Sequence, residues 1–368
     1  MKDRGFLVLF LAASAILCQA IPAEHGYQHL HFHRSGHDHG HASHDIPTHG
    51  LQDGRNATLS PRHFKRAQID NMCTEEHQKV TESLEDARHA FEKMSERNTH
   101  LANWLSNNPS SPPADIVVFS TFLTFSAIFG QIWWGSEEPE RNMKGVRAVR
   151  RQIDAADALR TALDSTTGAS PPIWEFHCDE NWLDERGGYD YWDTRDAERG
   201  GQVMRNLAEL QGACQDNTVN LLAYLSLDVR ENPVNPVEAV TFCEEGLDQW
   251  TDELRELYKL NFPPTAHIST VKLLSMGFTL LHELSHSKQV LGRNFYRDTA
   301  YSNGVNSAAY GWEAATAISN SPDNARNNAD SFAFFAAAMY LDKYDWHTGY
   351  ALSFDELDNM YSVNAREE

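Results

Sequence analysis

Three residues within Leu280–Gln289 (LLHELSHSKQ) have the types and the spacing of a metal site. His282 and His286 stand four positions apart, so on a helix they project from the same face. Two imidazoles placed in this way can bind one zinc ion, and Glu283 can reach a water molecule at that ion. The alternative interpretation is a solvated helical face that carries two unrelated histidines.

The sequence around this motif predicts the helix that the motif needs. Apolar residues, including Leu280, Leu281 and Leu284, give the segment a surface that can be buried, and Gly292 is a typical helix end. We therefore expect one helix over His267–Leu291.

A catalytic zinc ion has three protein ligands and a water molecule, so a third ligand is required. Val290–Arg293 contains no third histidine, which leaves carboxylates further along the chain. The candidates are Asp298, Glu313, Asp323 and Asp330.

Three motifs, in this order, resemble the deuterolysin-like (aspzincin) metallopeptidases, a family that includes fungal lysine-specific metalloendopeptidases. They are HELSH at 282–286, AYGWEAATAISNS at 309–321 and NNADSFAFFAAAMYL at 327–341, and the resemblance mainly covers Thr270–Leu341. It implies a helix-rich, zincin-like fold and zinc-dependent hydrolysis of protein or peptide substrates. Cleavage specificity, including any preference for lysine, depends on loops that the motifs do not align.

The chain departs from that family at the third ligand. The family has an aspartate in a Gly-Thr-x-Asp-x-x-Tyr-Gly pattern, whereas Gly304–Gly311 here is GVNSAAYG, with Ser307 at the aspartate position. Serine is a poor zinc ligand, so either the ligand has moved or the site is lost. Asp298, twelve residues after His286, is the expected replacement. Asp330 is the second candidate, or else a helix N-cap or a partner of a ligand histidine.

The implied reaction assigns a role to each of these residues. Zinc would polarise the scissile carbonyl, and Glu283 would act as general base towards the attacking water. Tyr310, in the matching Tyr-Gly pair, would donate a hydrogen bond to the developing oxyanion, or is alternatively a packed core tyrosine. The rival hypothesis from another class is a secreted, non-catalytic zinc-binding protein on the same fold.

The N-terminal part of the chain has the features of targeting and processing segments. Residues 1–20 are expected to be a signal peptide, with Phe6–Cys18 as its apolar part, so the protein is expected to be secreted. Residues 21–66 are expected to be a disordered pro-segment that ends at Lys65-Arg66, and His25–Gly50 within it holds nine of the eighteen histidines. Metal gathering and a plain polar spacer are the alternative roles. Residues 67–368 would form the catalytic domain.

Charge and cysteine content restrict the partners and the compartment. With 52 acidic and 31 basic residues, the chain has a formal charge of −21, which argues against nucleic acid as a partner. We expect a monomer. Loss of Cys18 with the signal peptide leaves four cysteines, which predicts two disulfides of open connectivity.

The coarse pattern predicts an α+β class, rich in helix and with a small sheet. Ile116–Trp134 lacks charge, but small and polar side chains on one face favour a helix buried in the core and no membrane anchor. Short strands are expected in PPIWEFHCDENW (171–182) and VEAVTFCEE (237–245), with a loop at 184–201. The other expected helices are Cys73–Leu105, Val146–Leu163, Ala208–Ser226, Glu244–Leu257 and Asp330–Lys343.

Overall fold

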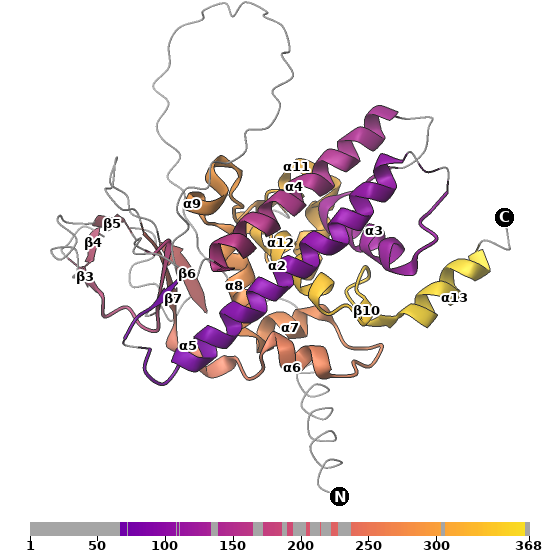
Figure 1. The fold of residues 1–368 in the computed structure, drawn as a ribbon. Coiled ribbons are helices and arrows are strands. Elements are labelled where there is room, and N and C mark those ends of the chain that lie inside the picture. The colour runs from indigo at the N-terminus through magenta and orange to yellow at the C-terminus, as the bar shows by residue number, and fades with distance from the viewer. Residues whose placement is uncertain are drawn as a thin grey trace, which may run out of the picture.

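The computed structural model describes residues 67–364, except residues 72, 108 and 110 and the segments 134–138, 165–171, 186–189, 194–203, 207–213, 215–221, 227–236 and 303–305 (Figure 1). The expected signal peptide and pro-segment lie outside the described residues.

Five helices form the body of the protein. In Figure 1, α2 and α4 run side by side, and α3, α8 and α12 pack against them. Their bounds are α2 His77–Ser106, α3 Ile116–Phe129, α4 Pro139–Asp164, α8 Met276–Ser285 and α12 Ala329–Tyr340. Short helices lie between them: α5 Glu244–Gln249, α6 Leu254–Lys259, α7 Ile268–Leu274, α9 Lys288–Leu291, α10 Trp312–Ala317 and α11 Pro322–Ala325, with 3-10 turns η2 Gly292–Asn294 and η3 Ile318–Asn320. Helix α13 Phe354–Asn364 follows α12.

The spacing of apolar residues in α2 explains how this long helix joins the core. Val80, Ala87, Phe91 and Met94 recur at intervals of three, four and seven residues and are fully buried. Phe91 lies 5.9 Å from the ring of Phe332 in α12. The central helices of the protein therefore share one core.

A small mixed sheet lies at one side of the helices, in the order β1-β2-β7-β6. Its strands are β1 Gln68–Ile69, β2 Trp174–His177, β7 Glu238–Phe242 and β6 Ala223–Ser226. The first three are parallel and β6 is antiparallel to β7. The expected α+β class is confirmed.

Two of the predictions for this part of the chain were wrong. The end of the helix expected over Ala208–Ser226 is strand β6, because pairing with β7 outweighs the weak helical pattern of its short apolar run. Part of the loop expected at 184–201 belongs to β3 (Leu183–Glu185) and β4 (Asp190–Asp193). These two strands pair with each other, and β4 also pairs with β5 (Met204–Asn206).

Residues 116–129 of the uncharged segment form a helix packed in the core, α3, as predicted, and the helix ends before Gly130. Asp115 caps α3 by accepting hydrogen bonds from Val117 N and Val118 N. Gly130 ends it with φ +87°, where a Cβ atom would meet Ser319 O at 2.6 Å. Among the described residues, no helix is long and apolar enough to cross a membrane.

Two disulfides are present, as the cysteine count predicted. Cys73 is bonded to Cys178, which ties the start of the described chain to the end of β2. Cys214 is bonded to Cys243, directly after β7.

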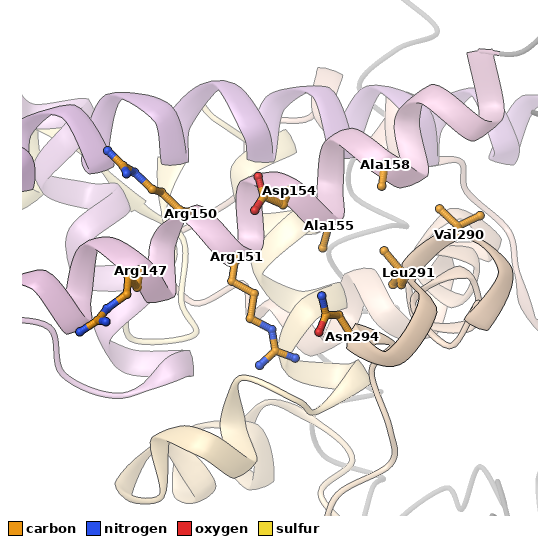
Figure 2. A pocket seen from close by; sticks show the side chains of 9 residues that line it. All are labelled: Arg147, Arg150, Arg151, Asp154, Ala155, Ala158, Val290, Leu291 and Asn294. Atoms are coloured by element: carbon orange, nitrogen blue, oxygen red, sulfur yellow. The ribbon is translucent and has the colours of Figure 1, made fainter. Parts of the chain in front are cut away.

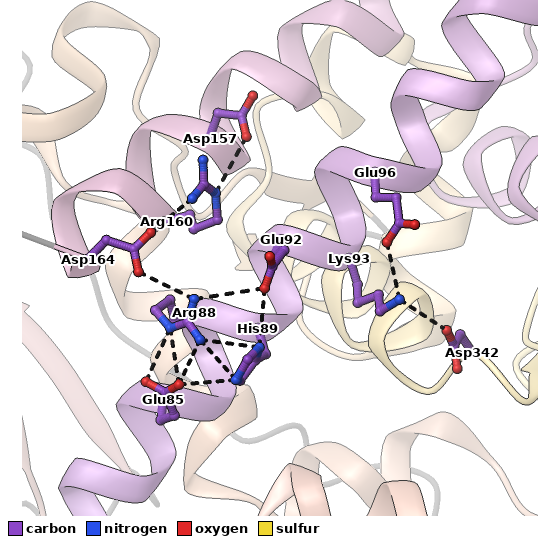
Figure 3. Close-up of polar contacts among 10 residues, drawn as sticks. All are labelled: Glu85, Arg88, His89, Glu92, Lys93, Glu96, Asp157, Arg160, Asp164 and Asp342. Carbon is purple, nitrogen blue, oxygen red and sulfur yellow. Dashed lines mark hydrogen bonds and ion pairs between the residues drawn. The ribbon is translucent and has the colours of Figure 1, made fainter.

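Surface ion pairs join the long helices to their neighbours (Figure 3). Arg88 in α2 lies 3.3 Å from Asp164 at the end of α4, and Lys93 lies 3.8 Å from Asp342 beyond α12. Because these side chains are partly exposed, each pair stabilises the fold by only ~0.2–1 kcal/mol.

Candidate metal centre

The helix α8 presents the histidine pair inside the protein. Every residue of α8 is buried, and His286 follows directly as its C-cap. The Nε2 atoms of His282 and His286 lie 3.2 Å apart. The two imidazoles therefore project from one side of α8 toward a common point, as the four-residue spacing predicted.

The helix expected over His267–Leu291 is three helices, α7, α8 and α9. At Ser275 the backbone is extended (φ −119°, ψ 120°). The backbone N–H groups of Thr251 and Asp252 both donate to Leu274 O, which competes with continuation of the helix. These donors come from the connection between α5 and α6, so the periodicity of the helix itself did not reveal the break.

Asp298 completes a triangle of donor atoms with the two histidines. Its Oδ1 lies 3.3 Å from His282 Nε2, and its Oδ2 lies 3.6 Å from His286 Nε2. A tetrahedral zinc ion with bonds of about 2.0–2.1 Å needs ligand atoms about 3.3–3.4 Å apart. The three side chains, each at most 3% exposed, therefore have the chemistry and the spacing to hold zinc.

Backbone pairing with the start of α12 fixes Asp298 in place. Arg297 N donates to Asn327 O at 2.7 Å, and Ala329 N donates to Arg297 O at 2.9 Å. On the other side of Asp298, Thr299 N donates to the side-chain oxygen of Asn328 at 3.1 Å. The segment that precedes α12 thus positions a residue some thirty positions earlier in the chain.

A hairpin separates Asp298 from Tyr310 along the chain. Strands β8 (Ala300–Ser302) and β9 (Asn306–Ala308) pair between Asp298 and Tyr310, and Ser307 lies in β9 opposite Tyr301. Ala309 N donates to Thr299 O, which closes the hairpin. The closed hairpin returns the chain to the metal centre, so the carboxylate comes before the hairpin and the tyrosine after it.

The second ring nitrogen of each histidine has a hydrogen-bond acceptor. His282 Nδ1 donates to Asp330 Oδ1 at 2.7 Å, and His286 Nδ1 donates to Tyr296 O at 3.0 Å. Such contacts fix the tautomer and the orientation of a histidine that binds metal, and leave Nε2 as the coordinating atom.

Asp330 thus contacts the outer nitrogen of His282. Its Oδ2 accepts hydrogen bonds from Lys272 Nζ at 2.7 Å and from Gly311 N at 2.6 Å. The N-cap of α12 is Asn328, so the N-cap interpretation of Asp330 was wrong. Although burial favours the neutral acid, Lys272 and His282 hold the pKa of Asp330 well below its usual range.

Lys272 is a residue of this site that the sequence analysis missed. It lies on α7, 9% exposed, and its ammonium group stands 5.6–5.9 Å from the ring centres of Phe278, Phe334 and Tyr310. The aromatic faces and the Asp330 carboxylate together compensate its buried charge. The available signal was a single lysine in the otherwise apolar VKLL segment.

The site has a negative potential that suits a cation. Burial opposes protonation of His282, but hydrogen bonds and charges from Asp298 and Asp330 raise its pKa to about 10. A site that favours positive charge this strongly on an imidazole also favours a metal cation between the same groups.

Glu283 and Tyr310 both lie at this centre. Glu283 is fully buried beside His282, and the ring of Tyr310 lies 6.1 Å from the ring of His282. Burial raises the pKa of Tyr310, and the charges of Asp298, Asp330 and Glu283 add to that rise, so its hydroxyl stays protonated and able to donate. The remaining carboxylate candidates, Glu313 in α10 and Asp323 in α11, are exposed.

Gly311 allows the turn that brings Tyr310 to the site. Its φ is +84°, a conformation that favours glycine. Gly311 directly follows Tyr310, and in this conformation its backbone N–H donates to Asp330.

Comparison with known proteins gives a partial similarity. A 63-residue segment is 44% identical to a protein named Neutral protease 2 homolog from Aspergillus fumigatus, and 43% identical to a protein of the same name from Neosartorya fischeri. The matched segment is 17% of this chain and spans only 11% of the length of each relative. No family model and no solved structure matches the chain.

Proposed function

We propose that this chain is a secreted zinc endopeptidase of the deuterolysin-like (aspzincin) type that hydrolyses peptide bonds in proteins or peptides. The observation that carries the proposal is the triangle of donor atoms from His282, His286 and Asp298. Hydrogen bonds from the Nδ1 atoms of both histidines to Asp330 and to Tyr296 O orient the two rings. The partial similarity to proteins named Neutral protease 2 homologs supports the same class of activity.

Each residue of the centre then has a chemical role. His282, His286 and Asp298 would hold zinc, which when bound lowers the pKa of water and polarises the scissile carbonyl. Glu283 accepts the proton of the attacking water and passes it to the leaving amine. Tyr310 keeps its proton and donates a hydrogen bond to the oxygen that gains negative charge. Asp330 and Lys272 hold His282 in the orientation that this chemistry requires.

Secretion is the setting that fits the cysteine chemistry. Both disulfides would persist in an oxidising compartment, where the expected signal peptide would direct the chain. The proposal includes removal of residues 21–66 and a monomeric catalytic domain over 67–368.

A non-catalytic zinc-binding protein is the second candidate, and it rests on Ser307 at the position where the family has its aspartate. The carboxylate of Asp298 lies within 3.3–3.6 Å of both histidines and supplies the charge that Ser307 lacks. Zinc binding by these residues fits both candidates, and Glu283 and Tyr310 at the same centre favour the enzyme, because a protein that only binds zinc needs neither a base nor an oxyanion donor.

Zinc content and casein hydrolysis, measured on the same preparation, test the proposal. The wild type should carry one zinc ion and cleave casein. Glu283→Gln should keep its zinc and lose roughly 10²–10⁴-fold in turnover, because it removes only the base. The control is Glu244→Gln, an exposed residue of α5, which should behave as wild type. Bound zinc without cleavage in the wild type would support the non-catalytic candidate, and an active Glu283→Gln would exclude the assigned base.

A further inference from the structure

A hollow on the outside of the helical body lies apart from the metal centre. It has a volume of about 390 Å³ and is formed by α4 on one side and by α9 and η2 on the other (Figure 2). None of the proposed metal ligands lines it. Cavities of this size are typical of small-molecule sites.

The hollow is positively charged although the chain as a whole is acidic. Arg147, Arg150 and Arg151 line it, with Asp154 as the single acidic residue, in a chain of formal charge −21. Figure 2 shows Arg151 extending from α4 toward Asn294, with Arg147 and Arg150 further along the helix. Within the described part of the chain, no salt bridge joins any of these three guanidinium groups to a carboxylate, and only the charge of Asp154 acts on one of them, Arg150.

One of these arginines is held in place before any ligand arrives. Arg151 Nη2 donates to the side-chain oxygen of Asn327 at 2.5 Å, and its guanidinium lies 5.9 Å from the ring centre of Tyr296. Arg326, next to Asn327, has a buried Nε atom without a hydrogen-bond partner among the described residues. Burial lowers the pKa of Arg326, the charge of Asp323 opposes that shift, and the charge of Arg151 adds to it.

Four apolar residues complete the lining of the hollow. Ala155 and Ala158 lie further along α4, and Val290 and Leu291 face them from α9. A ligand that contacts both the arginines and the apolar residues of the hollow has a negatively charged head and a short aliphatic body. A carboxylate matches guanidinium groups by charge and by geometry, because both are planar and can share two hydrogen bonds.

We propose that this hollow binds a small organic carboxylate with an aliphatic side chain. Two sources share this chemistry, a peptide that ends in an aliphatic residue and a short aliphatic acid. The site does not depend on the proposed peptidase activity.

Calorimetric titration of the full-length chain tests the proposal with three probes. N-acetyl-leucine represents the peptide terminus, hexanoate represents the aliphatic acid, and N-acetyl-leucinamide is the uncharged control. At least one of the two carboxylates should bind, and the amide should bind roughly tenfold more weakly or not at all. The tighter carboxylate identifies the source. Absence of binding by both carboxylates, or equal binding of N-acetyl-leucine and its amide, would overturn the proposal.

Variants locate the binding on the protein. The double variant Arg147→Gln/Arg151→Gln should weaken carboxylate binding by roughly tenfold or more. Arg160→Gln is the matched control, since Arg160 lies on the same helix outside the hollow and pairs with Asp164 at 2.9 Å. Equal weakening by the control would show a general charge effect and contradict the assignment.

A second variant covers the case in which the double variant does not fold. Ala158→Glu keeps the three arginines and adds a carboxylate among the apolar residues of the hollow, where it should compete with the ligand and reduce binding by a similar factor. Circular dichroism checks that its helix content is unchanged. A folded Ala158→Glu protein that binds like wild type would also reject the site.

Discussion

At the residue scale, two aspartates contact His282 from opposite sides. Asp298 is 3.3 Å from Nε2, the nitrogen that faces His286, whereas Asp330 bonds to Nδ1 on the outside. The same residue type therefore has two roles that depend only on which ring nitrogen it meets. Asp298 is the proposed metal ligand, and Asp330 contacts the nitrogen that such a ligand histidine leaves free.

This difference predicts distinct effects for two substitutions. Asp298→Ala should lose tightly bound zinc and activity together, because it removes one of the three ligands. Asp330→Ala should still bind zinc, with affinity lower by roughly 10–100-fold, and should unfold more easily because Lys272 loses its partner. Zinc titration against a chromogenic chelator measures both. If Asp298→Ala keeps stoichiometric zinc while Asp330→Ala loses it, the two roles are reversed.

At the element scale, a buried carboxylate on the sheet positions the helix that follows the histidines. Glu238 in β7 accepts hydrogen bonds from Lys288 N at 2.8 Å and Gln289 N at 3.0 Å, the first residues of α9. Its other oxygen accepts from Trp174 Nε1 at 3.1 Å. The sheet is thereby connected to the chain two residues beyond His286.

Glu238→Gln should lower the stability of the protein. Glutamine keeps one oxygen for the backbone N–H groups of Lys288 and Gln289, but its NH2 group cannot accept from Trp174 Nε1, and leaving that N–H unpaired costs about 1–3 kcal/mol. Urea denaturation measures the loss. The exposed Glu244→Gln serves as control and should change the free energy of unfolding by less than about 0.5 kcal/mol.

The cost of this substitution should also depend on pH. Burial raises the pKa of Glu238 above its unfolded value, so the folded protein binds this proton more tightly. That contribution to stability is full below the unfolded pKa of about 4.3 and is lost as the pH rises through the folded pKa. The stability advantage of wild type over Glu238→Gln should therefore grow as the pH falls from above the folded pKa of Glu238 toward about 4.3. An advantage that is constant over this range would contradict the assignment.

Features that depend on a local residue pattern could be predicted from the sequence. Features that depend on a residue far along the chain were missed. Apolar periodicity located α2 and α12, and spacing paired His282 with His286. Asp298 was singled out among four carboxylates only by the resemblance to the aspzincin family. The break at Ser275 was missed because its cause is the pair of N–H groups of Thr251 and Asp252. Lys272 was missed because its partner, Asp330, lies 58 residues further along the chain.

At the scale of the whole molecule, the two disulfides close loops of different length. Cys73 and Cys178 are separated by 105 residues, whereas Cys214 and Cys243 are separated by 29. The longer one also holds the N-terminal strand β1, which pairs with β2 at the edge of the sheet. The loop-entropy model therefore gives them unequal contributions to stability.

Replacing each pair by alanine tests this difference. Loss of Cys73–Cys178 should lower the free energy of unfolding by about 4.7 kcal/mol, and loss of Cys214–Cys243 by about 3.6 kcal/mol. Urea denaturation measures the free energy of unfolding of both double variants, and each variant serves as the control for the other because each removes one disulfide. A larger effect from the shorter loop would show that native contacts outweigh chain entropy at these bonds.

Processing of the secreted chain is a separate prediction for the whole molecule. Because the composition changes at Lys65-Arg66, the mature protein should begin near Ala67, directly before β1. N-terminal sequencing of protein from a secreting host gives the answer. A start at Ile21 would reject the pro-segment and favour a retained histidine-rich segment that gathers metal.

The carboxylate of Asp330 also limits how this protein can evolve. It receives hydrogen bonds from Lys272, His282 and Gly311, which belong to three separate parts of the chain. A descendant that changes only Lys272 is left with excess buried negative charge, and one that changes only Asp330 is left with a buried ammonium group. Either single step is disfavoured, so among divergent relatives the residues at positions 272 and 330 should be inherited, or replaced, as a pair.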